Sequence, residues 1–220
     1  EYNAPELAGK KAEFRCVIHE IRVKTQYELD DTFAKEVGHC QTLEEMRKLR
    51  ARFDGEGIRV WSIGSPIGKI QVDGDYAAHL DLYKHTLDLA GVFGADKIRL
   101  FSFYIPKGMD PAACRDTVLR RMDDFVVLAK PHGVTACHEN EKGIYGDIAS
   151  RCLDLHRNVP GLAAVFDPAN FIQCGQDTLE GWEMLCDYVN YMHIKDALPD
   201  GSVVPAGKGC GNAGKCGFNG

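Results

Sequence analysis

Short apolar runs alternate with segments of helical periodicity along most of the chain. In Leu43–Phe53, for example, Met46 and Leu49 lie three positions apart with charged residues between them, which is typical of an amphipathic helix. The predicted helices are Leu43–Phe53, Tyr76–Phe93, Asp110–Lys130, Gly146–Leu155 and Thr178–Leu185. The predicted strands are Ile58–Ile63, Lys97–Phe103, Val134–His138, Leu162–Phe166 and Tyr191–Ile194.

Strands that alternate with helices predict a parallel sheet covered by helices, in either a closed barrel or an open doubly wound sheet. Barrels carry their active-site residues at the carboxyl ends of several strands. Polar residues stand at the ends of the predicted strands here: Ser62, Ser102, Glu139, Asp167 and His193. A dinucleotide-binding open sheet would need GxGxxG after its first strand, whereas the near match Gly207–Gly211 lacks a flanking strand and helix and is interpreted as a loop. We therefore predict an α/β fold of the (β/α)8 TIM-barrel type, with residues 1–220 as one domain.

The composition indicates which broad class of protein this is, but it does not indicate an activity. The chain is 45% hydrophobic and 26% charged, which is ordinary for a soluble globular protein. It contains no apolar run of the roughly 18 residues that a membrane span needs, and its first residues lack the pattern of a signal peptide. The net charge of −6 counts against a nucleic-acid partner. Nine cysteines without a CxxC pair indicate reduced thiols, so we expect a cytoplasmic protein.

Three ionisable residues end successive apolar runs. Glu139 and Asp167 are 28 residues apart, and His193 follows 26 residues later, which is about one β/α unit per step. On consecutive barrel strands their side chains could converge on one point. Two carboxylates and one imidazole form a mixed oxygen and nitrogen site that suits one divalent ion such as Mn, Mg, Co or Zn.

Each of these residues also has an ordinary structural explanation. Asp167 precedes a proline and could cap a turn. His193 could be a core histidine bonded to a backbone carbonyl, and Glu139 could pair with Lys142. The equivalent position of all three in successive units favours a shared metal site over three separate structural roles.

The segments around these residues resemble the xylose isomerase-like TIM barrels, the sugar phosphate isomerase/epimerase superfamily that also contains endonuclease IV. The resemblance extends from about Glu20 to Gly209. The strongest matches are His138–Asp147, Phe166–Phe171 and Tyr191–Asp196, which are similar to the family's fifth, sixth and seventh strand ends. Weaker matches at Ile21–Val23 and Ile63–Lys69 are similar to its second and third strands.

The resemblance implies a metal-dependent isomerase or epimerase that acts on a small carbohydrate. It implies that Glu139, Asp167 and His193 bind the metal, and that Glu139 moves a proton beside a carbonyl through a cis-enediolate. It places five further residues near the substrate or behind the ligands: Asn170, Lys195, Asp196, His138 and Glu141. Lys208, in the glycine-rich loop, could in addition meet a phosphate.

Two departures from the family pattern stand out. The family has a fourth metal ligand on its eighth strand, a glutamate that is also the second acid/base group, whereas this chain ends in Lys215–Gly220 without one. Phe14–Ile18 is a poor candidate for a first strand. We therefore expect the first and eighth strands to be incomplete in the printed sequence.

Other functions use the same core. A dehydratase of a cyclic polyol, of the inosose type, could use the same metal. An endonuclease IV-like phosphodiesterase would need about three zinc ions and a histidine where Asn170 stands. A non-catalytic sugar-binding relative would keep the pocket and lack the second glutamate. The sequence leaves the substrate, the metal and the oligomeric state open, a homo-oligomer included.

Overall fold

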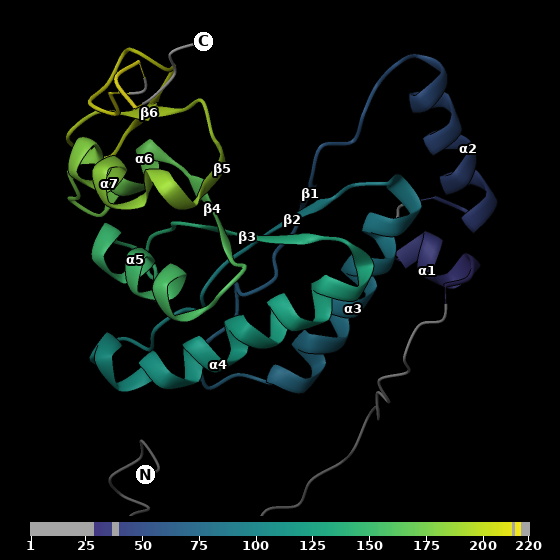
Figure 1. Ribbon diagram of the computed structural model, residues 1–220, viewed down its shortest axis with the longest axis horizontal. Helices are drawn as coiled ribbons and strands as arrows, with labels where there is room; N and C mark the ends of the chain where they lie inside the picture. The colour runs from purple at the N-terminus through teal and green to yellow at the C-terminus, as the bar shows by residue number, and fades with distance from the viewer. Residues whose placement is uncertain (1–28, 37–39, 213, 217–220) are drawn as a thin grey trace, which may run out of the picture.

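Five parallel strands form the central sheet of the computed structural model, which describes residues 29–36, 40–212 and 214–216 (Figure 1). The strands are β1 (Ile63–Gly64), β2 (Lys97–Leu100), β3 (Thr135–Glu139), β4 (Ala163–Phe166) and β5 (Val189–Met192). They pair in the order in which they follow one another in the chain. A doubly wound sheet would reverse its strand order at a switch point, whereas a barrel wall keeps the sequential order. The predicted α/β fold of the TIM-barrel type is confirmed, with five of its strands among the described residues.

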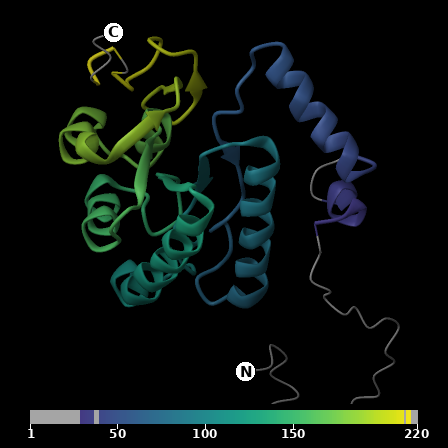
Figure 2. The ribbon, with the colours of Figure 1, turned by 45° about the vertical axis from the view of Figure 1, so that its right-hand side comes forward.

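A helical connection follows each of the first four strands. These helices are α3 (Tyr76–Phe93), α4 (Pro111–Ala129), α5 (Ala149–Asn158), and the pair α6 (Pro168–Gln173) and α7 (Thr178–Leu185). Short polar side chains begin several of them: the Asp75 carboxylate accepts from the Ala78 N–H at the start of α3, and Asp110 caps α4 ahead of a proline. Helices α3, α4, α5 and α7 lie along one side of the strands in Figures 1 and 2, and the apolar core lies between the two layers.

The main core lies between α3 and α4 on one side and β2 and β3 on the other, and a group of aromatic side chains packs within it. The rings of Phe103 and Phe125 stack with centroids 5.8 Å apart, and Tyr83 lies 4.8 Å from Phe125. A second cluster joins α5, α6 and α7 around Phe166 and Phe171. Full burial of each such side chain contributes roughly 1.5–3 kcal/mol. The two clusters hold β2, β3 and β4 against their helices and thereby fix where these strands end.

A third cluster attaches the first two described helices, α1 (Asp31–Glu36) and α2 (Leu43–Gly55). Phe33 and Met46 are fully buried there and pack with Val92 and Phe93 of α3. In Figures 1 and 2 both helices lie at the outer side of α3. They therefore lie far from the ends of β3, β4 and β5.

The structure agrees with most predicted elements and shifts several boundaries. Helices α3 and α7 have the predicted bounds, and α2 and α4 differ from theirs by one or two residues at an end. The first described strand is only Ile63–Gly64, and β5 begins two residues before the predicted strand. Helix α5 begins at Ala149, later than predicted, and the Gly146 N–H in the turn before it donates to the Ser102 hydroxyl.

Four short elements were not predicted from the pattern: α1, α6, and the antiparallel strands β6 (Asp196–Ala197) and β7 (Val203–Val204). The candidate strand segments Phe14–Ile18 and Ile21–Val23 lie outside the described residues. Within the described part of the chain, no helix has the length and apolar character that crossing a membrane requires.

Candidate metal centre

The pleat of the parallel strands sends three predicted side chains to the same side of the sheet. Glu139 is the last residue of β3 and pairs in register with Val165 of β4, which in turn pairs with Tyr191 of β5. Side chains two residues apart on a strand share a face. Asp167 and His193 each lie two residues beyond a partner of Glu139, so all three side chains point to the same side at the carboxyl ends of their strands.

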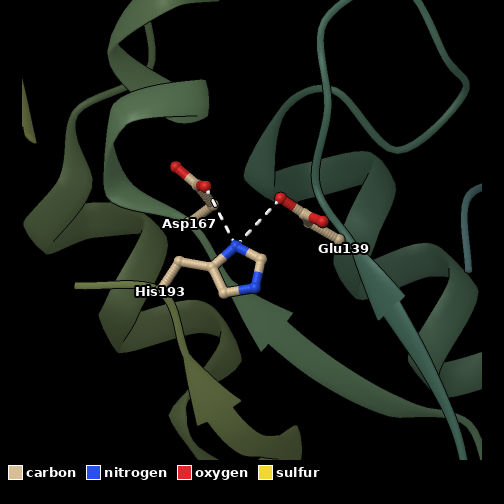
Figure 3. A group of neighbouring side chains, drawn as sticks. All are labelled: Glu139, Asp167 and His193. Atoms are coloured by element: carbon tan, nitrogen blue, oxygen red, sulfur yellow. Dashed lines mark hydrogen bonds and ion pairs between the residues drawn. The ribbon is translucent and has the colours of Figure 1, made fainter. Parts of the chain in front are cut away.

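The three side chains converge on one point (Figure 3). One ligand atom from each lies within 4.8 Å of the ligand atoms of the other two. The His193 Nδ1 atom is 3.1 Å from Glu139 Oε1 and 3.2 Å from Asp167 Oδ2. Glu139 and Asp167 are 4% and 0% exposed. The spacing of the three residues in the sequence therefore corresponds to one compact group in space.

The donor set fits a divalent cation. It consists of two carboxylate oxygens and one imidazole nitrogen, the ligands that hard and borderline ions accept. The Glu139 Oε2 atom is buried and has no hydrogen-bond partner among the described residues. The Arg99 guanidinium, 3.3 Å away, compensates the charge of this oxygen without a hydrogen bond, and a divalent cation bound by the same carboxylate would add to that compensation.

Electrostatics within the group are dominated by the imidazole. Hydrogen bonds to Asp167 and Glu139 raise the pKa of His193 to about 9. Burial acts to raise the pKa of Asp167, but hydrogen bonds from His193 and from the Asn170 N–H, together with the Lys195 ammonium, outweigh it and hold that pKa below its ordinary value. Without a metal ion, the group is therefore an imidazolium between two carboxylates.

Two asparagines fix the carboxylates. The Asn140 side chain accepts from the Asp167 N–H and donates to the Asp167 carbonyl, both at 2.9 Å. The Asn170 N–H donates to Asp167 Oδ1 at the start of α6, and its side-chain amide donates to Glu139 Oε1 at 3.2 Å. Asn170 was predicted from the sequence and Asn140 was not. The sequence signal for Asn140 was its position directly after Glu139, the carboxylate residue that ends β3.

Two cationic side chains contact the same carboxylates. Lys195 Nζ lies 3.0 Å from Asp167 Oδ2 and 2.9 Å from Asn170 Oδ1. Arg99 Nη1 lies 3.3 Å from Glu139 Oε2, and its guanidinium carbon lies 5.0 Å from the centroid of the Phe101 ring. Sequence reasoning found Lys195 and missed Arg99, whose only signal was a charge inside an apolar strand.

Two of the predicted substrate-side residues lie elsewhere, and their expected placement is corrected. Asp196 is 1% exposed, and its carboxylate accepts backbone N–H groups from Ala197, Gly207, Gly209 and Gly211. Its carboxylate therefore organises the glycine-rich loop. A Cβ atom on Gly209 would lie 2.2 Å from the Ala197 carbonyl oxygen, so this loop requires glycine there.

The expected placement of His138 is also corrected. It is the residue before Glu139 in β3, so its side chain points to the opposite face of the strand, toward the helices. Its Nε2 atom is 2.9 Å from the Ser102 hydroxyl, and its ring lies 6.0 Å from that of His156 on α5. Burial lowers the pKa of His138 well below its ordinary value. Its ring therefore packs in the layer between sheet and helices.

The other two predicted residues lie at the surface of this end of the sheet. Glu141 forms an ion pair with Lys69, with 2.9 Å between Oε2 and Nζ. Lys208 is exposed in the glycine-rich loop. Neither residue contributes an atom to the three-residue group.

Comparisons with known proteins agree with this fold. Residues 27–215 match the family described as xylose isomerase-like TIM barrel. A xylose isomerase domain protein from Planctomyces limnophilus superposes with a TM-score of 0.66 and 22% identity, covering 88% of this chain and 83% of that one. The IOLI protein with a bound zinc atom superposes with a TM-score of 0.66 and 14% identity. The superposition covers 81% of this chain and 66% of that one.

A third solved structure is the probable 3-DHS dehydratase AsbF from Bacillus anthracis. Its TM-score is 0.64 and its identity 18%, with 76% of this chain and 61% of that chain covered. The present chain thus spans less than two thirds of that protein. At these identities the three structures show a common fold.

The curated relatives match a much shorter stretch. Trigger factor of Caldicellulosiruptor saccharolyticus is 53% identical over 47 residues, which is 21% of this chain and 11% of that protein. The chain therefore spans about a tenth of the curated relatives it matches. The barrel-family match leaves no 47-residue segment outside it, so the two matches overlap. So short a match assigns no activity to the chain.

The two hydrogen bonds between the Asn140 side chain and the Asp167 backbone should contribute to stability. Asn140→Ala leaves the Asp167 N–H and carbonyl without their partners in a buried place, so we expect the free energy of unfolding to fall by about 1–3 kcal/mol. Asn158→Ala is the control, because the Asn158 amide is exposed on α5, and its expected effect is below about 0.5 kcal/mol. Urea unfolding followed by circular dichroism measures both. Equal effects of the two substitutions would contradict a stabilising role of the Asn140–Asp167 hydrogen bonds.

Proposed function

Because the chain belongs to the xylose isomerase-like TIM barrel family, we propose that it is a divalent-metal-dependent isomerase or epimerase of a sugar, sugar phosphate or sugar acid. The convergence of Glu139, Asp167 and His193 is the observation that carries the proposal. Solved neighbours described as a D-tagatose 3-epimerase-like protein and a D-psicose 3-epimerase support the reaction class. The zinc-bound IOLI protein supports the use of a metal.

In this proposal Glu139 Oε1, Asp167 Oδ2 and His193 Nδ1 hold the ion. The bound ion would polarise the substrate carbonyl and stabilise the negative charge that develops on its oxygen. Asn170 donates to both carboxylates, and Asn140 holds the backbone of Asp167, so that both carboxylates stay in place while the substrate binds and leaves. Such pre-positioning is the main contribution that a rigid scaffold makes to catalysis.

Glu139 is the proposed base. Its Oε1 atom is engaged by His193 and Asn170, whereas Oε2 accepts no hydrogen bond among the described residues. Oε2 is therefore the oxygen that takes the proton from the carbon beside the carbonyl and returns it to the neighbouring carbon. Arg99, 3.3 Å from Oε2, orients the carboxylate.

One base on one face of the substrate is sufficient for an isomerisation. Epimerisation needs a second group that delivers the proton from the opposite face, and the family uses its strand-eight glutamate there.

A dehydratase is the second candidate, because Lys195 places an ammonium group beside the same carboxylates. Glu139 would remove a proton from carbon, and Lys195 would donate a proton to the departing hydroxyl, which leaves as water. An endonuclease IV-like activity has less support. Among the described residues, one group of three or more potential ligands is found, and Asn170, within α6, stands where a further histidine would be needed.

Proton exchange tests the role of Glu139. Glu139→Gln keeps the shape of the side chain and removes its basicity, so exchange of the substrate α-hydrogen in deuterium oxide should fall by about 100- to 10,000-fold. A panel of ketoses, ketose phosphates and keto acids, followed by NMR, provides the measurement. Glu141→Gln is the matched control, since Glu141 lies two residues away and pairs with Lys69, and it should keep most of the exchange. Full exchange in the Glu139 variant would exclude it as the base.

Metal binding should depend on pH because the ion competes with a proton on His193. The folded pKa of about 9 lies above the ordinary value, so the imidazole is protonated at neutral pH and must lose that proton when the metal binds. Affinity for Mn²⁺ should therefore rise by about tenfold per pH unit from about pH 6 to 8, with about one proton released per ion.

Calorimetry in buffers of different ionisation enthalpy measures both quantities. His193→Ala should weaken binding by at least about 10- to 100-fold and remove the pH dependence. His132→Ala, at an exposed histidine, should change neither. Affinity that is independent of pH in the unsubstituted protein would contradict the assignment of His193.

A further inference from the structure

Two cationic side chains reach the candidate metal centre from opposite sides. Lys195 Nζ lies 3.0 Å from Asp167 Oδ2, and Arg99 Nη1 lies 3.3 Å from Glu139 Oε2. Their side chains are 34% and 28% exposed, so both are partly accessible from the site. In the metal-free protein these two cations and His193, which lies between the carboxylates, together compensate Glu139 and Asp167.

This balance changes when a divalent ion binds. The ion takes up the negative charge of Glu139 and Asp167, and leaves Lys195 and Arg99 without counter-charges. Charges in a partly buried site interact more strongly than in water, so two uncompensated cations beside a divalent ion are unfavourable.

The nearby carboxylates do not supply the missing negative charge. Glu141 is already paired with Lys69. The Asp196 carboxylate is occupied by four backbone N–H groups of its own loop. The remaining source of negative charge is the substrate.

Resting on the proposed function, we propose that the substrate is a sugar acid, whose carboxylate lies next to the reacting carbons and is bound by Lys195 and Arg99. Arginine and lysine form strong, charge-assisted hydrogen bonds to carboxylates. Both cations contact the metal ligands themselves, so the anionic group they bind must lie within a few bonds of the carbonyl.

A terminal phosphate ester fits this arrangement less well. It would lie further from the carbonyl, near the loop that carries Lys208. Three backbone N–H groups of that loop, from Gly207, Gly209 and Gly211, already donate to Asp196. These three N–H groups are therefore not available to hold a phosphate.

Two six-carbon ketoses that differ only at C1 provide the test. D-Fructose has a hydroxymethyl group at C1, and 2-keto-D-gluconate has a carboxylate there. The full chain is dialysed against Mn²⁺, its metal content is measured by elemental analysis, and each compound is then titrated calorimetrically. We expect the acid to bind at least about tenfold more tightly than the neutral ketose.

Variants separate recognition by the side chains from recognition by the ion. Lys195→Met should remove most of the preference for the acid, and Lys195→Arg should keep most of it. Lys69→Met is the matched control, a nearby lysine that pairs with Glu141, and it should keep the full preference. Circular dichroism and the Mn²⁺ content establish that each variant is folded and loaded.

The outcomes distinguish this inference from the proposed function. A folded protein that takes up no Mn²⁺ overturns both. A loaded protein that binds both compounds equally, or whose Lys195→Met variant keeps the full preference, overturns the sugar-acid inference and leaves the metal-dependent function standing. A preference for the acid that is lost in Lys195→Met and kept in Lys69→Met supports it.

Discussion

Two carboxylates, Glu139 and Asp167, are buried side by side at the ends of adjacent parallel strands. Removing a carboxylate from water is unfavourable by several kcal/mol unless charges and hydrogen bonds compensate it. The surrounding residues provide that compensation, with His193 between the carboxylates and Arg99 and Lys195 beside them. This arrangement stabilises the apo protein and also prepares the donor atoms that a divalent ion would use.

The barrel wall determines the position of these groups. The register of β3, β4 and β5 directs alternate side chains to one side, and the two aromatic clusters hold the strands against their helices. Asn140 then joins the end of β3 to the backbone of Asp167. Asp167 is the N-cap of helix α6, so its carboxylate caps the helix with one oxygen and faces the centre with the other. Fold and site therefore depend on the same hydrogen bonds.

Much of this was predictable from the sequence, because an apolar run that ends in an ionisable residue is a local signal. This signal is present at Glu139, Asp167 and His193, and their spacing of about one β/α unit indicates consecutive strands. Strand β5 begins two residues before its predicted start. Its pairing with β4 shifts register between Ala164 and Val165, and a pattern of apolar and polar residues does not show such a shift.

The residues that were missed or misplaced depend on tertiary contacts. Arg99 interrupts an apolar strand, and only the structure shows that its charge faces Glu139. The partners of Asn140 and Asp196 are backbone groups of other segments, which no side-chain pattern identifies. Asp167 was predicted as a ligand, but its second role as the cap of α6 was not, because the following Pro168 also fits a simple turn.

The central claim is that one divalent ion binds among Glu139, Asp167 and His193. An anomalous difference map from crystals of the Mn²⁺-loaded protein tests it most directly. The account predicts one strong peak within about 2.0–2.3 Å of a carboxylate oxygen of Glu139, a carboxylate oxygen of Asp167 and Nδ1 of His193. A peak elsewhere, or no peak with Lys195 still on Asp167, would contradict it.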